Sequence, residues 1–132
     1  MYRRLLLVAS IALTMTTIAL AEQNESWLTR SGYYRISYRS DLEPLAINRI
    51  HSWTFHVETP DGKPVTGAVI SVTGGMPLHN HGLPTDPAMT AETGDGNYVV
   101  EGFRFHMNGA WELFVTVDVD GKRDTAVLAL TL

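Results

Sequence analysis

The sequence predicts an all-β domain, an antiparallel two-sheet sandwich of six to seven strands. Three observations support this prediction. Apolar and polar residues alternate with a period of two in several segments, which is the pattern of half-buried strands. Turn residues, mainly Gly, Pro, Asp and Asn, recur at regular spacing between those segments. No segment after residue 31 keeps the apolar period of an amphipathic helix.

The first three predicted strands follow from alternation and turn chemistry. Residues 34–39 alternate aromatic or aliphatic residues with Arg and Ser. Residues 51–59 form the clearest strand, and one of its faces carries an apolar row that consists of His51, Trp53, Phe55 and Val57. Residues 59–64 predict a turn, since Pro presets φ and Gly accepts a positive φ. Residues 67–73 form the next strand, whose inward residues are expected to be Ala68, Ile70 and Val72.

The second half of the chain completes the predicted sheets. A short strand over residues 88–93 is followed by a turn at 94–97. In the predicted strand 98–107, the apolar phase slips by one residue at Gly102, which predicts a β-bulge there. The last two strands, 111–119 and 124–132, are joined by a tight hairpin turn at Asp120-Gly121. Together the strands predict a sandwich of immunoglobulin-like type without the disulfide.

The first 21 residues have the composition of a signal peptide. Arg3 and Arg4 precede an apolar run over residues 5–20, and Ala19-Leu20-Ala21 fits the small-residue cleavage rule. The run is shorter than the roughly 20 residues that span a bilayer, so cleavage is favoured over a membrane anchor, and a periplasmic or secreted protein is expected. The predicted organisation is a signal peptide (1–21), a flexible N-terminal segment (22–31) and one domain (32–132).

Charge and cysteine content exclude several classes of function. Cleavage lowers Lys+Arg from 10 to 8 and leaves Asp+Glu at 14, so the processed chain is near −6. An acidic domain argues against nucleic-acid binding, which needs clustered cations. The absence of Cys excludes thiolate metal sites, Cys nucleophiles and disulfides. No Gly-x-Ser-x-Gly, His-Glu-x-x-His or phosphate-binding glycine loop occurs, so the sequence predicts a protein that is not an enzyme.

Residues 74–85 (Gly-Gly-Met-Pro-Leu-His-Asn-His-Gly-Leu-Pro-Thr) form the most distinctive segment of the chain. Their Gly and Pro content predicts a constrained loop, not a helix or a central strand. His79 and His81 are two residues apart, so in an extended loop both imidazoles point the same way and can reach one ion. With the Met76 thioether, which selects Cu(I) over hard cations, they predict a copper site. Zinc and nickel accept the same imidazoles and stay open as alternatives, as does a surface loop that holds no metal.

Four other residues are weaker candidates for the site. Met107 would meet the loop if its strand and the strand before the loop end at the same edge of the sandwich. His106 is expected to point to the opposite face unless the strand end bends. His51 lies on an apolar face, so we expect a core residue first and a ligand second. Asp86 would supply an oxygen ligand that favours zinc or Cu(II).

A series of short motifs extends over residues 45–130. In order, the motifs are Asn48-Arg49-Ile50-His51-Ser52-Trp53, Asp61-Gly62-Lys63-Pro64-Val65 with Gly67-Ala68, Gly75-Met76-Pro77 with His79, His81-Gly82 and Pro84-Thr85, and Phe105-His106-Met107-Asn108-Gly109-Ala110-Trp111-Glu112-Leu113. This series resembles the YtkA-like and FixH-like group of small exported or membrane-anchored β-sandwich proteins. Its specific parts are Met-Pro-x-His-x-His-Gly and Phe-x-Met-x-Gly-x-Trp. The resemblance implies a β-sandwich fold and a role in copper handling or cytochrome oxidase maturation.

Two functions from different classes follow from these observations. The first is a copper carrier, buffer or delivery factor that holds Cu(I) and exchanges it with a membrane or periplasmic cuproprotein. The second is a protein-interaction module without a metal. In that case the loop is a rigid epitope, and its Met76, Leu78 and Leu83 make apolar contacts with an exported or membrane complex.

Overall fold

The computed structural model describes residues 25–132, which fold into nine antiparallel strands. The strands are β1 (Ser26–Leu28), β2 (Arg35–Ser40), β3 (His51–Glu58), β4 (Val69–Met76), β5 (His81–Gly82), β6 (Ala88–Gly94), β7 (Asn97–Phe103), β8 (Ala110–Val119) and β9 (Lys122–Thr131). The all-β prediction is confirmed, and the two short strands β1 and β5 raise the strand number above the expected six to seven. The predicted signal peptide, residues 1–21, lies outside the described residues.

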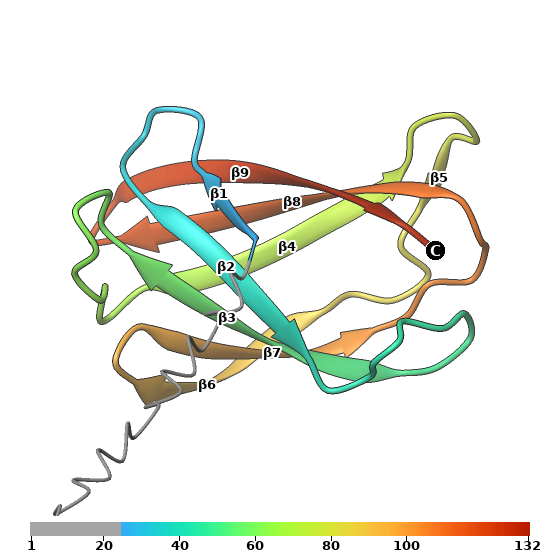
Figure 1. Ribbon diagram of the computed structural model, residues 1–132, viewed down its shortest axis with the longest axis horizontal. Coiled ribbons are helices and arrows are strands. Elements are labelled where there is room, and N and C mark those ends of the chain that lie inside the picture. The colour runs from blue at the N-terminus through green and yellow to red at the C-terminus, as the bar shows by residue number, and fades with distance from the viewer. Residues whose placement is uncertain (1–24) are drawn as a thin grey trace, which may run out of the picture.

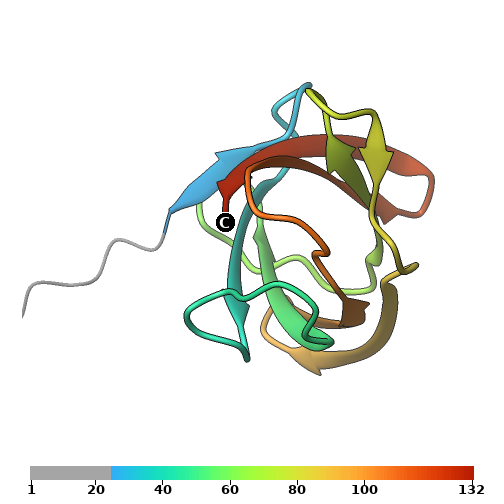
Figure 2. The same ribbon diagram turned by 90° about the vertical axis from the view of Figure 1, so that its right-hand side faces the viewer.

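The strands form one continuous sheet that folds over itself and nearly closes around the core (Figures 1 and 2). Their order is β1-β2-β3-β7-β6-β4-β8-β9, and β5 pairs separately with the end of β4. The two outer strands approach each other where the backbone N–H of Arg30 donates to the carbonyl of Thr125 over 3.0 Å. Within residues 25–132 there is no helix of the length and apolarity that crossing a membrane requires.

The core is built from the apolar rows that the alternation predicts. Every second residue of β3, from His51 to Val57, is buried, and the inward residues of β4 are buried as well. Trp53 lies at the centre, stacked between Tyr38 at 4.0 Å and Phe103 at 4.6 Å between ring centroids. Burying an aromatic side chain of this size contributes about 3 kcal/mol to folding. The period-two pattern therefore identified the buried faces of β3 and β4 correctly.

Both predicted backbone irregularities are confirmed. His51 pairs with Phe103 and Ser52 pairs with Glu101, so Gly102 is the extra residue of a β-bulge. Gly102 has a φ of 93°, a conformation that a side chain would strain. The turn between β8 and β9 has a positive φ at both Asp120 and Gly121, as a tight hairpin turn requires.

Between β4 and β6 the sheet is held mostly by side chains. The two strands share a single backbone pairing, Ser71 with Ala88. The N–H of Ile70 on β4 donates to the sulfur of Met89 on β6 over 3.3 Å. The hydroxyl of Tyr98 on β7 holds the segment just before β4: it donates to the carbonyl of Val65 over 2.6 Å and accepts from the N–H of Ala68 over 3.1 Å. Burial raises the pKa of this hydroxyl, which stays protonated and available as a donor.

Replacing Tyr98 by Phe is expected to lower the free energy of unfolding by about 1–2 kcal/mol, because two buried backbone groups lose their partner. Urea unfolding of the purified chain measures this change. Tyr33→Phe is the matched control, since Tyr33 is 43% exposed, and it should shift stability by less than about 0.5 kcal/mol. Equal effects of the two substitutions would argue against a role of Tyr98 in closing the sheet.

The N-terminal segment corrects one expectation. Residues 22–31 were predicted to be flexible, yet residues 26–28 form β1 and pair with β2. Trp27 stacks on Tyr38 with ring centroids 5.6 Å apart, and Thr29 is buried. A strand of three residues has too little alternation to be read from sequence.

Candidate metal site

The candidate site lies at one end of the sheet, where β4 ends, β5 begins, β7 ends and β8 begins. Figure 1 shows this end on the right, and Figure 2 turns it toward the viewer. The β4–β5 loop and the segment 104–109 between β7 and β8 both lie there. The two segments that carry the candidate ligands therefore reach the same end of the molecule, which is the condition under which Met107 was expected to lie near the histidines.

The segment 74–85 was predicted to be a constrained loop, and the structure corrects this, because part of the segment belongs to two paired strands. β4 continues through Gly74 and Gly75 to Met76, and β5 pairs back on it with Met76 opposite His81 and Gly75 opposite Gly82. Glycine serves here for close approach of two strands: a Cβ on Gly75 would overlap the carbonyl oxygen of His81. Composition alone cannot separate this use of glycine from use in a flexible loop.

A four-residue turn, 77–80, joins β4 to β5 and presents the first histidine. Pro77 opens the turn, and the N–H of His79 donates to the carbonyl of Met76 over 3.1 Å. Asn80 adopts a φ of 52°, the left-handed conformation that Asn tolerates. His79 is exposed in the turn, and Leu78 beside it is 84% exposed.

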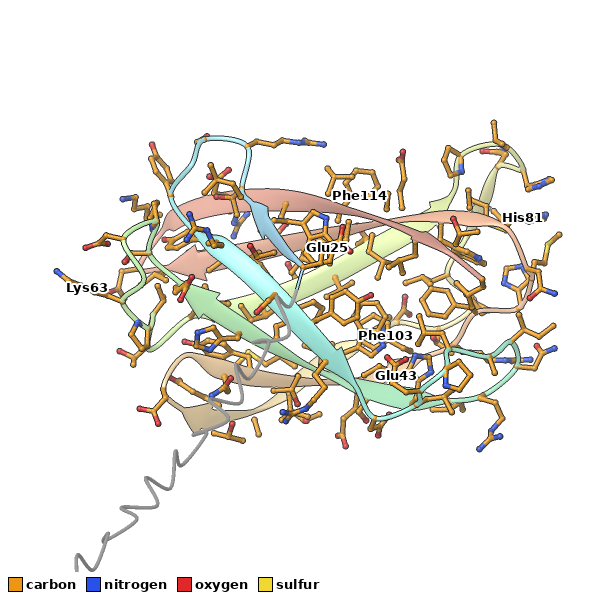
Figure 3. The ribbon with its side chains drawn as sticks, viewed as in Figure 1. Glu25, Glu43, Lys63, His81, Phe103 and Phe114 are labelled. Atoms are coloured by element: carbon orange, nitrogen blue, oxygen red, sulfur yellow. The ribbon has the colours of Figure 1, made fainter. Side chains whose placement is uncertain are left out.

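Three imidazoles follow one another at this end. The ring centroids of His79 and His81 are 6.4 Å apart, and those of His81 and His106 are 5.5 Å apart. His106 in turn contacts the buried Trp111 edge-to-face at 5.5 Å. Figure 3 shows His81 at the edge of the molecule, where solvent reaches it. His106, which comes from another segment, thus adds a third ring to the predicted pair of His79 and His81.

His106 reaches this position because β7 is shorter than predicted. The strand was expected to run from 98 to 107, but it ends at Phe103, where its partner β3 also begins. Beyond that point the chain bends, and Asn48 donates its N–H to the carbonyl of Phe105 over 2.7 Å. His106 therefore does not follow the alternation of the strand. Its Nδ1 is buried without a hydrogen-bond partner, so one ring nitrogen is left for another ligand.

The two methionines lie beside the histidines at different depths. Met76 is buried, and its Cα partner in the β4–β5 pair is His81, so the two side chains leave the sheet on the same face. Its methyl carbon packs against Gly109, in the bend that follows His106. Met107 is partly buried against the core, and its carbonyl accepts the indole N–H of Trp111 over 3.0 Å.

His51 and Asp86 are the remaining candidates. His51 is buried among Trp53, Phe103 and Phe105, with centroid distances of 5.8–6.3 Å. Its Nδ1 donates to the carbonyl of Arg49 over 3.0 Å if that nitrogen carries the proton, while Nε2 is buried without a partner. This burial agrees with the expectation that His51 is first of all a core residue. Asp86 is exposed in the segment between β5 and β6.

The distances between the imidazole rings can be compared with the distance expected for two rings that bind one metal ion. A nitrogen about 2.0 Å from a metal places the ring centroid about 3.1 Å from it, so two rings on one ion have centroids about 5–6 Å apart. His81 and His106 meet this distance, and His79 lies slightly beyond it. Within residues 25–132, no three His, Cys, Asp or Glu side chains are already arranged to hold an ion. Binding through all three rings would require movement of the exposed turn 77–80.

Comparison with known proteins identifies the domain. The family model described as YtkA-like matches residues 34–116. The chain belongs to the YtkA-like family. The match includes β2 to β7, both histidine-bearing segments and most of β8.

A solved structure supports the fold of this YtkA-like domain. The crystal structure of a DUF4426 family protein from Pseudomonas aeruginosa PAO1 superposes with a TM-score of 0.55 and 14% sequence identity. The alignment covers 80% of this chain and 94% of the other. At this identity the likeness concerns the fold alone. No curated protein matches the chain.

Proposed function

We propose that this YtkA-like domain is an exported copper-binding protein that acts as a carrier, buffer or delivery factor. The ligands we assign are the imidazoles of His81 and His106, joined by His79 from the turn and by the Met76 thioether. The observation that carries the proposal is the pairing of His81 with His106 across two segments at 5.5 Å, with a ring nitrogen of His106 buried and unpartnered.

The donor set favours Cu(I) over the zinc alternative. Neutral imidazoles bind copper and zinc alike, but a thioether is a soft ligand that prefers Cu(I). Met76 leaves β4 on the same face as His81, close to the bend that carries His106. An oxygen ligand such as Asp86 would instead favour zinc or Cu(II).

Exposure of the ligands suits a protein that transfers its ion. His79 and His81 are exposed, so an acceptor can approach the metal before the ion leaves. A periplasmic or secreted location, and a membrane or periplasmic cuproprotein as acceptor, complete the proposal. Maturation of a cuproenzyme or an oxidase is one process in which such transfer is needed.

The test is anaerobic competition for Cu(I) against a chromogenic chelator, using the chain purified after export. We expect the His81→Ala/His106→Ala double variant to bind Cu(I) at least about 100-fold more weakly, a loss of about 2.7 kcal/mol. His56→Ala is the matched control, because His56 lies on β3 and pairs with Glu58 at 3.6 Å. Equal affinity in the double variant and the wild type would refute the proposed site.

The alternative is an interaction module, and one observation favours it. Leu78, at the tip of the turn, is 84% exposed, the highest value among the large hydrophobic side chains of residues 25–132, and is therefore available for an apolar contact. In this case Leu78→Ser would abolish capture of a partner, while the histidine variant would capture it normally in the presence of a chelator. The reverse result would support the copper function.

A further inference from the structure

A groove crosses the outer face of the sheet next to the candidate metal site. The backbone register aligns four residues across β5, β4, β8 and β9, in the order Gly82, Gly75, Glu112 and Ala129. Because Gly75 and Ala129 flank Glu112 with little or no side chain, the carboxylate has open space on both sides. The groove has a volume of about 360 Å³ at this place, and its walls include Pro77, Asn80 and Phe114.

The groove has a single acidic group that the protein itself does not neutralise. Glu112 is the one carboxylate among the lining residues. The ion pairs found in residues 25–132 do not include it. Glu112 is half-buried, so water screens the charge less than at a fully exposed position.

The aromatic residue of the groove is already in contact with a guanidinium group of this chain, that of Arg30. Phe114 follows Glu112 by two residues on the same face of β8, and the guanidinium carbon of Arg30 lies 5.9 Å from its ring centroid. Figure 3 shows Phe114 and His81 on the same upper side of the molecule. An incoming guanidinium that pairs with Glu112 would therefore compete with Arg30 for the ring of Phe114.

We propose that this groove binds an arginine side chain from an extended segment of a partner protein. A guanidinium group matches a carboxylate with two parallel hydrogen bonds and also stacks on an aromatic face, whereas a lysine ammonium offers only a point charge. The acidic net charge of the chain complements a basic segment. The proposal does not depend on copper, although His81 and Met76 line the groove as well.

The experiment is a titration of the ¹⁵N-labelled chain, purified after export, with the tripeptide acetyl-Gly-Arg-Gly-amide in the presence of a copper chelator. We expect shifts of the backbone signals of Gly75, Gly82 and Glu112, with a dissociation constant on the order of 1 mM, which suits one side chain. The peptide that carries the neutral isostere citrulline should bind at least about fivefold more weakly. Glu112→Gln should reduce the affinity for the arginine peptide by a similar factor.

Controls separate this proposal from folding effects and from the copper function. Glu101→Gln removes one charge from an exposed position on β7 and should leave binding of the arginine peptide unchanged. Signals of β1 to β3 should be the same in the Glu112 variant as in the wild type, which shows that the variant folds. Equal binding of the arginine and citrulline peptides, or an unchanged affinity in Glu112→Gln, would overturn the proposal. Since the chelator removes copper, failure of the copper proposal leaves these results unaffected.

Discussion

Replacing Gly75 by Ala is expected to lower the free energy of unfolding by about 2–3 kcal/mol, the upper part of the range for inserting one extra carbon into a packed region. The new methyl group would overlap the carbonyl oxygen of His81, and a backbone atom cannot rotate away as a flexible side chain can. β5 must therefore separate from β4. This separation moves His81, so the affinity for Cu(I) should fall by about tenfold as well.

Gly82→Ala is the matched control for this prediction. A Cβ on Gly82 has the carbonyl oxygen of Gly74 as its nearest neighbour, at an ordinary 3.8 Å. The two variants add the same methyl group to paired residues of one hairpin, so their comparison isolates the steric overlap. Urea unfolding and Cu(I) competition measure the two effects. If both variants behaved alike, the close approach of β5 to β4 would not be what positions His81.

The same glycines explain why the sequence described this region only in part. The signal in residues 74–85 was composition, and Gly with Pro predicted a loop. In the structure Gly74, Gly75 and Gly82 are absent from the residues with positive φ, and Gly74 faces the buried Leu113 across the strand pair. These glycines permit close contact between strands. For Gly74 that use depends on Leu113, which is 39 residues away in the chain, so a local pattern cannot reveal it.

The alternation of apolar and polar side chains predicted more of the structure than the Gly and Pro content did. It is a local property that determines which face of a strand is buried. It predicted the inward row of β3 and the bulge at Gly102 correctly. It failed at His106, where the end of β7 is set by the starting points of the neighbouring strands. Identifying His79 and His81 needed only their spacing, whereas placing His106 beside them needed the fold.

Replacing Asp124 by Asn is expected to lower the free energy of unfolding by about 2–3 kcal/mol at pH 7, because a buried carboxylate loses its charge-assisted hydrogen bonds. Asp124 is only 6% exposed. Its carboxylate accepts the backbone N–H groups of Ser31 and Tyr33 at 3.0–3.3 Å and thereby ties the turn between β1 and β2 to β9. The substitution weakens the closure of the sheet at its outer strands.

The pH dependence of this effect follows from the pKa of Asp124. Burial alone would raise this pKa, but hydrogen bonds from Thr29 and from the N–H groups of Ser31, Tyr33 and Thr125 outweigh it and hold the pKa below its ordinary value. Since the folded-state pKa is lower than the unfolded value of about 3.9, the unfolded chain binds more protons between the two values. The stabilisation is complete above the unfolded pKa and is lost as pH falls through the folded pKa.

Urea unfolding at several pH values tests both parts of this prediction. The difference in stability between wild type and Asp124→Asn should be constant from pH 7 to about pH 5 and should shrink below about pH 4, because only the wild type has a carboxylate to protonate. Asp95→Asn makes the same chemical change at an exposed turn residue with a φ of 52°, which Asn also tolerates, and should shift stability by less than about 0.5 kcal/mol. A difference that stayed constant down to pH 2 would mean that the loss of an acceptor oxygen to an amide NH2 group, and not the loss of the negative charge, weakens the link between the N-terminal turn and β9.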